Sequence, residues 1–386
     1  MIRTTFARYT DSWPEKLVRM SGHDGPVHDI KFSNDGRLVA SASSGQHCVW
    51  DVMTGRCLSR YTDHLSNVSM VQWSQDGRLL ASSCADGVIQ LWDPSTAFCH
   101  ATLRGHSREI NALQFSGTGQ LIVSASNDKT VRVWNASTRL RQATLVGHSS
   151  AVRAVVFSMD ACAIASASDD GTVRIWDTAT GICRATLIGH EDIVTSVTFS
   201  RHGKLVASTS RDLTTRVWNL EDALPYRVLQ GHSALVTTAA FSPDGQILAT
   251  AAQDSTIRLW DIHQGTYTLI FAECAPAPWC IKSLSFSQDG RYLETDHGLI
   301  RIPSNEAALQ TAAQHTLSAT SGWVVHRQEP VLGLPAGFEP LCSTTHGDTI
   351  CLGHRSGSWT LLRFDDDGKL TRLWVFVGTS RGLLQP

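Results

Sequence analysis

Six tryptophans recur at a fixed interval, and this spacing constrains the fold more than any other feature of the chain. They stand 42 residues apart, at Trp50, Trp92, Trp134, Trp176, Trp218 and Trp260. A period between 20 and 50 residues indicates one supersecondary unit stacked on copies of itself, because such a small unit cannot bury its own apolar face. The sequence therefore predicts a repeat architecture.

The unit that ends at Trp176 contains only short strand patterns. Four of them follow one another, at residues 151–158, 162–166, 172–177 and 183–189. They are rich in valine, isoleucine and threonine and are separated by turn signals such as the Asp-Gly pair at residues 170–171. Four antiparallel strands with this period are typical of one blade of a β-propeller.

Pairs of Gly-His and Trp-Asp at fixed offsets resemble those of the WD-repeat family. His follows Gly at residues 22–23, 105–106, 147–148, 189–190 and 231–232, and Asp63 replaces the glycine before His64. The tryptophan comes 28 residues after the histidine in five units and 27 after it in the first. The resemblance implies an all-β fold, a closed WD-repeat β-propeller of seven to eight four-stranded blades.

The resemblance also implies that a histidine, a hydroxyl, an aspartate and the tryptophan of a unit form a hydrogen-bonded tetrad. Such tetrads are expected from His64, Ser82, Asp86 and Trp92; His106, Ser124, Asp128 and Trp134; His148, Ser166, Asp170 and Trp176; His190, Ser208, Asp212 and Trp218; and His232, Thr250, Asp254 and Trp260. An imidazole can donate to a carboxylate and accept from a hydroxyl, whereas an indole N–H only donates.

The recurrence of histidine, serine and aspartate superficially suggests nucleophilic catalysis. Catalysis needs one exposed nucleophile and an oxyanion site, whereas these residues recur unit after unit beside a tryptophan. We therefore assign them to the structural frame and expect no catalytic residue.

Two units depart from the pattern. The first has Ser44 in place of the aspartate, although Ser41 and Trp50 remain. The seventh, at residues 282–303, has Ile302 where the tryptophan is expected and Cys274 where the histidine is expected. We expect the seventh blade to be held by apolar packing without a complete tetrad.

The chain divides into three parts on this interpretation. Residues 1–15 form an N-terminal lead-in, and residues 16–303 form blades one to seven, with the strand at 16–22 completing the last blade as the resemblance implies. Residues 304–386 form an irregular insert and a final blade. Within them, 305–314 has helical composition, 322–327 and 329–335 indicate a hairpin, and 342–365 with 371–377 indicates four more strands.

Residues 283–365 carry a narrower resemblance. The runs FSQDGRYLETDHGLIRIP, PVLGLP and CLGHRSG resemble the C-terminal end of the WD-repeat domain in fungal NACHT-type proteins, which are signalling NTPases. The sequence has no Gly-x-x-x-x-Gly-Lys-Ser/Thr loop. The resemblance implies a stand-alone or truncated sensor part of such a protein.

Composition excludes several partners. With 33 basic and 35 acidic residues the net charge is −2, which creates no field for nucleic acid or an anionic membrane. No signal peptide or 18-residue apolar run is visible, so we expect a cytoplasmic protein, with the nucleus as the alternative. The ten cysteines show no Cys-x-x-Cys pair, which indicates reduced thiols. Cys48, Cys84 and Cys162 are expected in strands as small core residues.

Two clusters have the residue types of a metal site. Cys342, His346, Cys351 and His354 are zinc-ligand types, but strand alternation places Cys351 and His354 on opposite faces. Residues 365–367 are aspartates without the glutamate that a calcium loop needs, so they predict a solvated turn. We expect no metal and no cofactor.

Two positions vary while the frame repeats, and the resemblance implies that both lie on one partner-binding face. From these positions we expect the partner contacts to be His28, Asn111, Asn127, Arg153, Asp169, Arg211 and Gln253. Arg153 and Arg211, in adjacent units, suit a carboxylate or phosphate. A plain solvated rim is the alternative, and pairing with Asp169 would neutralise one arginine.

These observations favour a non-catalytic scaffold or ligand-sensing domain that binds other proteins, as a monomer or within a larger complex. One alternative is an adaptor subunit of a chromatin or ubiquitin-ligase complex. Another is a propeller enzyme, which would need an acid, a base or a metal cluster at the central channel that does not repeat between units. The sequence shows no such cluster.

Overall fold

The computed structural model describes most of residues 20–302 and the strands that follow. The described residues are 20–21, 23, 25–54, 56–61, 68–96, 98–271, 281–296, 298–302, 315–319, 323–326, 329–333, 340–346, 349–354, 359–364 and 370–377. Every regular element among them is a β-strand. Within these residues no helix is long and apolar enough to cross a membrane.

The first six sheets, numbered along the chain, each contain four antiparallel strands in sequence order. Sheets one to three comprise β2 (Val27–Phe32), β3 (Leu38–Ser43), β4 (Gln46–Asp51), β5 (Cys57–Tyr61); β6 (Val68–Trp73), β7 (Leu80–Cys84), β8 (Ile89–Asp93), β9 (Phe98–Leu103); and β10 (Ile110–Phe115), β11 (Leu121–Ser126), β12 (Thr130–Asn135), β13 (Arg141–Val146). Sheets four to six comprise β14 (Val152–Phe157), β15 (Ala163–Ser168), β16 (Thr172–Asp177), β17 (Cys183–Ile188); β18 (Val194–Phe199), β19 (Leu205–Ser210), β20 (Thr214–Asn219), β21 (Leu224–Gln230); and β22 (Val236–Phe241), β23 (Ile247–Ala252), β24 (Thr256–Asp261), β25 (Tyr267–Phe271).

The second strand of each sheet explains the small residues of the sequence. Every residue of β15, AIASAS, is buried, because neighbouring sheets cover both of its faces. Its partner β16 pairs in a register that sets Trp176 opposite Ile164. The tight turn between them places Gly171 at φ 79°, a conformation that glycine adopts without strain.

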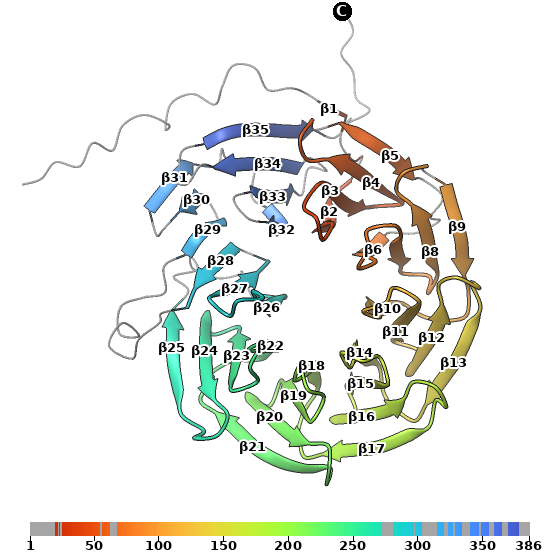
Figure 1. The fold of residues 1–386 in the computed structure, drawn as a ribbon, viewed down its shortest axis with the longest axis vertical. Coiled ribbons are helices and arrows are strands. Elements are labelled where there is room, and N and C mark those ends of the chain that lie inside the picture. The colour runs from red at the N-terminus through yellow and green to blue at the C-terminus, as the bar shows by residue number, and fades with distance from the viewer. Residues whose placement is uncertain are drawn as a thin grey trace, which may run out of the picture.

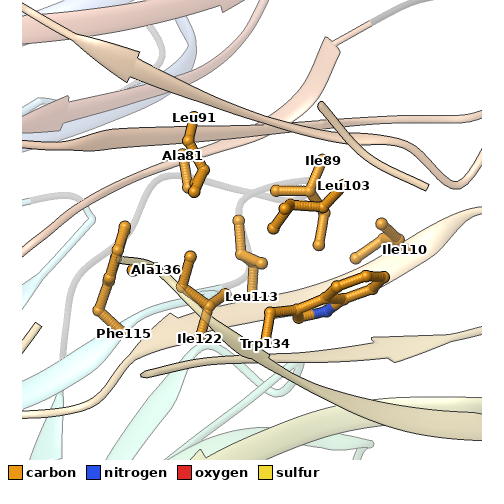
Figure 2. Close-up of a cluster of buried hydrophobic side chains, with 10 residues drawn as sticks. All are labelled: Ala81, Ile89, Leu91, Leu103, Ile110, Leu113, Phe115, Ile122, Trp134 and Ala136. Atoms are coloured by element: carbon orange, nitrogen blue, oxygen red, sulfur yellow. The ribbon is translucent and has the colours of Figure 1, made fainter. Parts of the chain in front are cut away.

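Each tryptophan packs between its own sheet and the preceding one. Figure 2 shows this for the second and third sheets, where Leu91 and Leu103 lie in one cluster with Ile110, Leu113 and Trp134. Equivalent clusters join sheets three and four, four and five, and five and six. The core therefore lies between the sheets, and each unit completes its burial on its neighbour.

The seventh sheet is larger than the sequence predicts. It contains β26 (Leu284–Phe286), β27 (Tyr292–Thr295), β28 (Gly298–Arg301), β29 (His315–Ala319), β30 (Trp323–His326) and β31 (Glu329–Gly333). The predicted hairpin is confirmed as β30 and β31, but β29 pairs with β28 and so adds the hairpin to this sheet. The expected boundary at residue 303 therefore falls inside the seventh sheet.

Apolar side chains hold the seventh sheet against the sixth. Leu293 and Ile300 are buried with Ala249 and Leu259 of sheet six, and Ile302 packs against the same cluster. This is the packing that the missing tryptophan led us to expect. Cys274 and residues 305–314 lie outside the described residues.

The eighth sheet corrects our expectation for the N-terminal strand. Its four antiparallel strands all come from the C-terminal part: β32 (Pro340–His346), β33 (Thr349–His354), β34 (Trp359–Phe364) and β35 (Leu370–Val377). The N-terminal β1 (Met20–Ser21) is a fifth strand, parallel to β35, with Met20 paired to Phe376. The N-terminal strand is therefore not the one that completes the blade, because the C-terminal residues already supply four strands.

Sheets one and eight share a core cluster. Ile30 and Val39 of sheet one are buried with Cys351 and Leu361 of sheet eight. The ring of Phe32 lies 5.6 Å from that of His346, between centroids. Figure 1 shows the eight sheets following one another around a circle, with β32 beside β2.

The cysteines are distributed as expected with one exception. Cys48 and Cys84 lie in strands and are buried. Cys162 is exposed and precedes β15, so its assignment to the core is wrong. It lies at the end of a turn in which Asp160 accepts from its backbone N–H.

Candidate functional site

Four of the repeated tetrads lie wholly within the described residues and have the same geometry. In sheet four, His148 Nδ1 lies 2.9 Å from Asp170 Oδ2 and His148 Nε2 lies 2.8 Å from Ser166 Oγ. Trp176 Nε1 donates to the same serine oxygen at 2.8 Å. The same bonds, at 2.8–2.9 Å, join His106, Ser124, Asp128 and Trp134; His190, Ser208, Asp212 and Trp218; and His232, Thr250, Asp254 and Trp260.

A threonine that the sequence analysis missed completes each set. Thr172 donates its hydroxyl to Asp170 Oδ1 at 2.6 Å, and the Ser149 N–H donates to Asp170 Oδ2 at 2.9 Å. The equivalent threonines are Thr130, Thr214 and Thr256. Their 42-residue spacing was the signal that would have revealed them.

The electrostatics of the set favour a neutral imidazole beside a charged carboxylate. Burial lowers the pKa of His148 and outweighs the opposing effect of Asp170. Burial acts to raise the pKa of Asp170, but bonds from Thr172, Ser149 and His148 lower it to about 2. The imidazole therefore donates from Nδ1 and accepts at Nε2, as its neighbours require.

This geometry suits a structural role for the repeated residues. Ser166 is fully buried, with its hydroxyl held between an imidazole and an indole. A nucleophile must reach its substrate, and this oxygen cannot. What the bonds do is join the loop before the first strand to the second and third strands of the same sheet.

Sheets one and two carry incomplete sets among the described residues. In sheet one, His23 Nε2 lies 2.7 Å from Ser41 Oγ and Trp50 Nε1 donates to the same oxygen, while Ser44 at the aspartate position is exposed. In sheet two, Trp92 donates to Ser82 at 2.8 Å and Asp86 is exposed. His64 lies outside the described residues.

An arginine two residues before the tryptophan packs close to the glycine of the Gly-His pair. A Cβ atom added to Gly147 would lie 2.6 Å from Arg174 Nη1, so a larger residue here would displace the guanidinium. The guanidinium carbon of Arg174 lies 5.9 Å from the Trp176 ring centroid. Equivalent contacts occur at Gly105 with Arg132, Gly189 with Arg216, and Gly231 with Arg258.

The first variable position lies on a β-bulge and ties sheets together. Asn111, at a register shift in β10, donates from Nδ2 to Asn127 Oδ1 at 2.8 Å and to the Val152 carbonyl of the next sheet at 2.9 Å. Thr195 and Thr237 likewise donate to carbonyls of their next sheets, each at 2.6 Å. Asn111 and Asn127 are therefore engaged by the frame.

The two arginines of the expected partner face differ in their surroundings. Arg153 donates through Nε and Nη2 to both oxygens of Asp169, at 2.7 and 2.5 Å. This is the neutralising pair that we named as an alternative. Among the described residues, the carboxylate paired with Arg211 is that of Asp192 at 3.9 Å, and the arginine side chain is 61% exposed. His28 and Gln253 are exposed as well, so these two and Arg211 are the open positions of the face.

His346, Cys351 and His354 do not form a metal site among the described residues, and the side chain of Cys342 lies outside them. His346 is exposed, whereas Cys351 is buried in the cluster between sheets one and eight. His354 is buried and its Nε2 lies 2.8 Å from Thr360 Oγ1. No group of histidine, cysteine, aspartate and glutamate among the described residues has the geometry of a metal site. Residues 365–367 lie outside them.

The repeated sheets and their tetrads define a WD-repeat protein. The model of the family "WD domain, G-beta repeat" matches residues 14–51, 55–93, 97–135, 140–177, 181–219 and 224–261, which is more than half of the chain. The chain therefore belongs to the WD40 repeat family.

Curated relatives share short stretches with this chain. Periodic tryptophan protein 2 homolog of Dictyostelium discoideum is 36% identical over 73 residues, 19% of this chain and 8% of the relative. Eukaryotic translation initiation factor 3 subunit I of Pyricularia oryzae is 32% identical over 75 residues, 19% of this chain and 22% of the relative. A subunit of chromatin assembly factor 1 of Mus musculus is 34% identical over 73 residues, 19% of this chain and 13% of the relative. The match thus spans less than a quarter of each relative.

Proposed function

We propose that this protein is a non-catalytic scaffold that binds other proteins and works as a subunit of a larger assembly. The observation that carries the proposal is the division of labour within each unit. The histidine, hydroxyl and aspartate side chains of sheets three to six bond to one another, while the loops between the strands present residues that differ from unit to unit. Two of the relatives are named as subunits, of translation initiation factor 3 and of chromatin assembly factor 1.

The platform for binding is a closed ring of eight blades in this proposal. The cluster shared by sheets one and eight and the parallel pairing of β1 with β35 support closure. A closed ring removes sheet edges between blades and fixes the loops of adjacent blades relative to one another.

An adaptor subunit is favoured over a signalling sensor as the narrower form of the proposal. The resemblance to NACHT-type proteins rests on residues 283–365, beyond the last segment that the family model matches. Of the relatives named above, one is a translation initiation factor subunit, one is a chromatin assembly factor subunit and one is a periodic tryptophan protein. We propose that the protein acts inside the cell, in the cytoplasm or nucleus. The reduced thiols of Cys48 and Cys162 support this location.

Capture of partners from a lysate, followed by mass spectrometry, tests the proposal. The test variant combines His28→Ala, Arg211→Glu and Gln253→Ala on the partner-binding face. Its matched control changes the same residue types in turns at the opposite ends of the strands, with Arg201→Glu, His202→Ala and Gln246→Ala, which are all exposed. We expect the test variant to lose partners that the parent and the control retain.

The identity of the captured partners also distinguishes the adaptor subunit from the signalling sensor. Subunits of a translation or chromatin factor would support the adaptor, and a nucleotide-binding signalling protein would support the sensor. A test variant that captures every partner of the parent would contradict the assignment of the face.

A further inference from the structure

A cleft opens over the second sheet, at the end of the molecule away from the partner-binding face. Because consecutive strands are antiparallel, the turns after the first and third strands lie at one end of each sheet, and the variable loops lie at the other. The cleft has a volume of about 890 Å³ and is lined by these turns from sheets two and three and by residues of sheet one. Buried Leu91 and Ala136, both drawn in Figure 2, contribute to its lining, together with Leu58, Leu79 and Pro94.

One lining residue breaks the repeat in an unusual way. Arg139 stands at a turn position where the backbone is left-handed, with φ 65°. The equivalent residues of the next three sheets are Gly181, Ala223 and Gly265, with φ 71°, 57° and 74°. A long side chain in this conformation is strained, whereas glycine is not.

The side chain of Arg139 reaches across the cleft to the second sheet. Arg139 Nη2 lies 3.2 Å from His100 Nδ1, and a guanidinium can only donate. His100 Nδ1 therefore accepts, and the imidazole proton is on Nε2, which lies 3.8 Å from Asp93 Oδ2. Asp93 in turn accepts from the Ser95 hydroxyl and N–H. This chain of contacts orients the guanidinium at the cleft.

The positive charge of Arg139 is not compensated. No carboxylate of the described residues lies within 4.0 Å of its guanidinium, whereas Arg78, in the same lining, has Asp76 at 3.8 Å. A guanidinium has five N–H donors in a planar fork, and Arg139 uses one of them for the bond to His100. The remaining donors match the two oxygens of a carboxylate.

We propose that this cleft is a second protein-binding site, which takes an acidic peptide segment with one carboxylate on Arg139 and a neighbouring apolar side chain over Leu58, Leu79 and Pro94. A concave, mostly apolar surface with a few converging polar groups is typical of a binding site. The site is separate from the partner-binding face, so the scaffold would hold two partners on opposite ends. The proposal does not depend on which residues of that face bind.

Arg139→Gly is a sharp test, because it removes the charge and gives the turn the residue used in sheets four and six. We expect this variant to be at least as stable as the parent in urea denaturation. Lys129→Gly is its matched control. Lys129 also has a left-handed backbone, φ 71°, in the turn between the second and third strands of the same sheet, where Gly87 and Gly171 stand in neighbouring sheets. The control therefore makes the same change of charge and backbone at the opposite end.

The probe is a displayed library of random 12-residue peptides, selected on the full chain. Enriched peptides are synthesised, and their dissociation constants are measured by fluorescence polarisation. We expect peptides with Asp or Glu close to Leu, Ile or Val that bind the parent and Lys129→Gly equally. Arg139→Gly should bind them about tenfold or more weakly, as expected for loss of a charged hydrogen bond.

A second arm changes the peptide instead of the protein. Replacement of its Asp or Glu by the amide should weaken binding to the parent by a similar factor and have little further effect on Arg139→Gly. The proposal would be overturned by enriched peptides without a carboxylate, by the absence of any enriched peptide, or by equal binding to Arg139→Gly and the parent.

Discussion

The aspartate of each tetrad receives more hydrogen bonds than any other member of the set. Asp170 accepts from the Thr172 hydroxyl and N–H, from the Ser149 N–H and from His148 Nδ1. Both carboxylate oxygens are thus needed as acceptors. An amide at this position would turn an NH₂ group toward at least one donor, which leaves polar groups unsatisfied.

Asp170→Asn should therefore lower the free energy of unfolding by about 1–3 kcal/mol in urea denaturation. Asp160→Asn, in a turn of the same sheet, is the control. There only Oδ1 accepts, from the Ser158 hydroxyl and the Cys162 N–H, and an amide oxygen can replace it. Equal losses in the two variants would contradict the role given to the tetrad.

The protonation of the tetrad histidines predicts how stability depends on pH. Burial lowers the pKa of His106, His148, His190 and His232. In the unfolded chain their pKa is about 6.5, so below this pH the unfolded state binds more protons than the folded state. The free energy of unfolding should then be constant above about pH 7 and fall between pH 7 and 5.

The aspartates add a second loss at lower pH, because the pKa of Asp170 is about 2 and rises on unfolding. Urea denaturation across this range measures both effects. His148→Gln should show a shallower decline between pH 7 and 5 than the parent. An unchanged free energy of unfolding from pH 7 to pH 5 in the parent would contradict the neutral, buried histidines.

At the residue scale, the family resemblance together with the 42-residue spacing predicted the histidine, hydroxyl, aspartate and tryptophan of each tetrad, and sheets three to six repeat the same bonds. This prediction missed the threonines and arginines beside them only because the family's tetrad does not include them. Cys162 was misplaced for a different reason. An apolar run does not define where a strand begins, and the turn bonds of Asp160 exclude this residue from β15.

Apolar contacts join the seventh sheet to the sixth. Leu293 is fully buried in the cluster with Ala249 and Leu259 of sheet six. Leu293→Ala should lower the free energy of unfolding by about 2–5 kcal/mol. Ile182→Ala, at a side chain that is 64% exposed, should have little effect. A loss below about 1 kcal/mol at Leu293 would contradict its burial in a core shared by two sheets.

Strand patterns predicted the hairpin and the last four strands of the C-terminal part, but neither β29 nor the pairing of these strands. The residues of β30 and β31 alternate as a hairpin does, and the hairpin is present. Which sheet it joins depends on β29, whose pairing with β28 involves contacts that no local pattern contains. The eighth sheet takes its four antiparallel strands, β32 to β35, from the C-terminal residues. The N-terminal β1 therefore lies at the outer edge of this sheet, beside β35.

At the scale of the whole molecule, the two ends of the chain contribute unequally to the eighth sheet. Deletion of residues 1–21 removes β1, which pairs with β35 through Met20 and Ser21 in the described part of the chain, and should cost little stability. Deletion of residues 370–386 removes β35 and exposes the edge of β34, so this variant should aggregate. Size-exclusion chromatography and urea denaturation compare the two. Aggregation of the N-terminal deletion alone would instead favour a first strand that completes the blade.

Closure of the ring between sheets one and eight is the central claim, because the binding faces exist only if the blades are fixed in one circle. Phe32 and His346 lie across this junction. The measurement is cross-linking of Phe32→Cys with His346→Cys by a short bifunctional maleimide in dilute protein, with mass mapping of the linked peptides. The control is the pair Phe32→Cys and His202→Cys, whose positions belong to sheets one and five, which are not neighbours. We predict a linked peptide within the monomer for the first pair and none for the second; absence of the first link, with both cysteines singly modified, would contradict a closed ring.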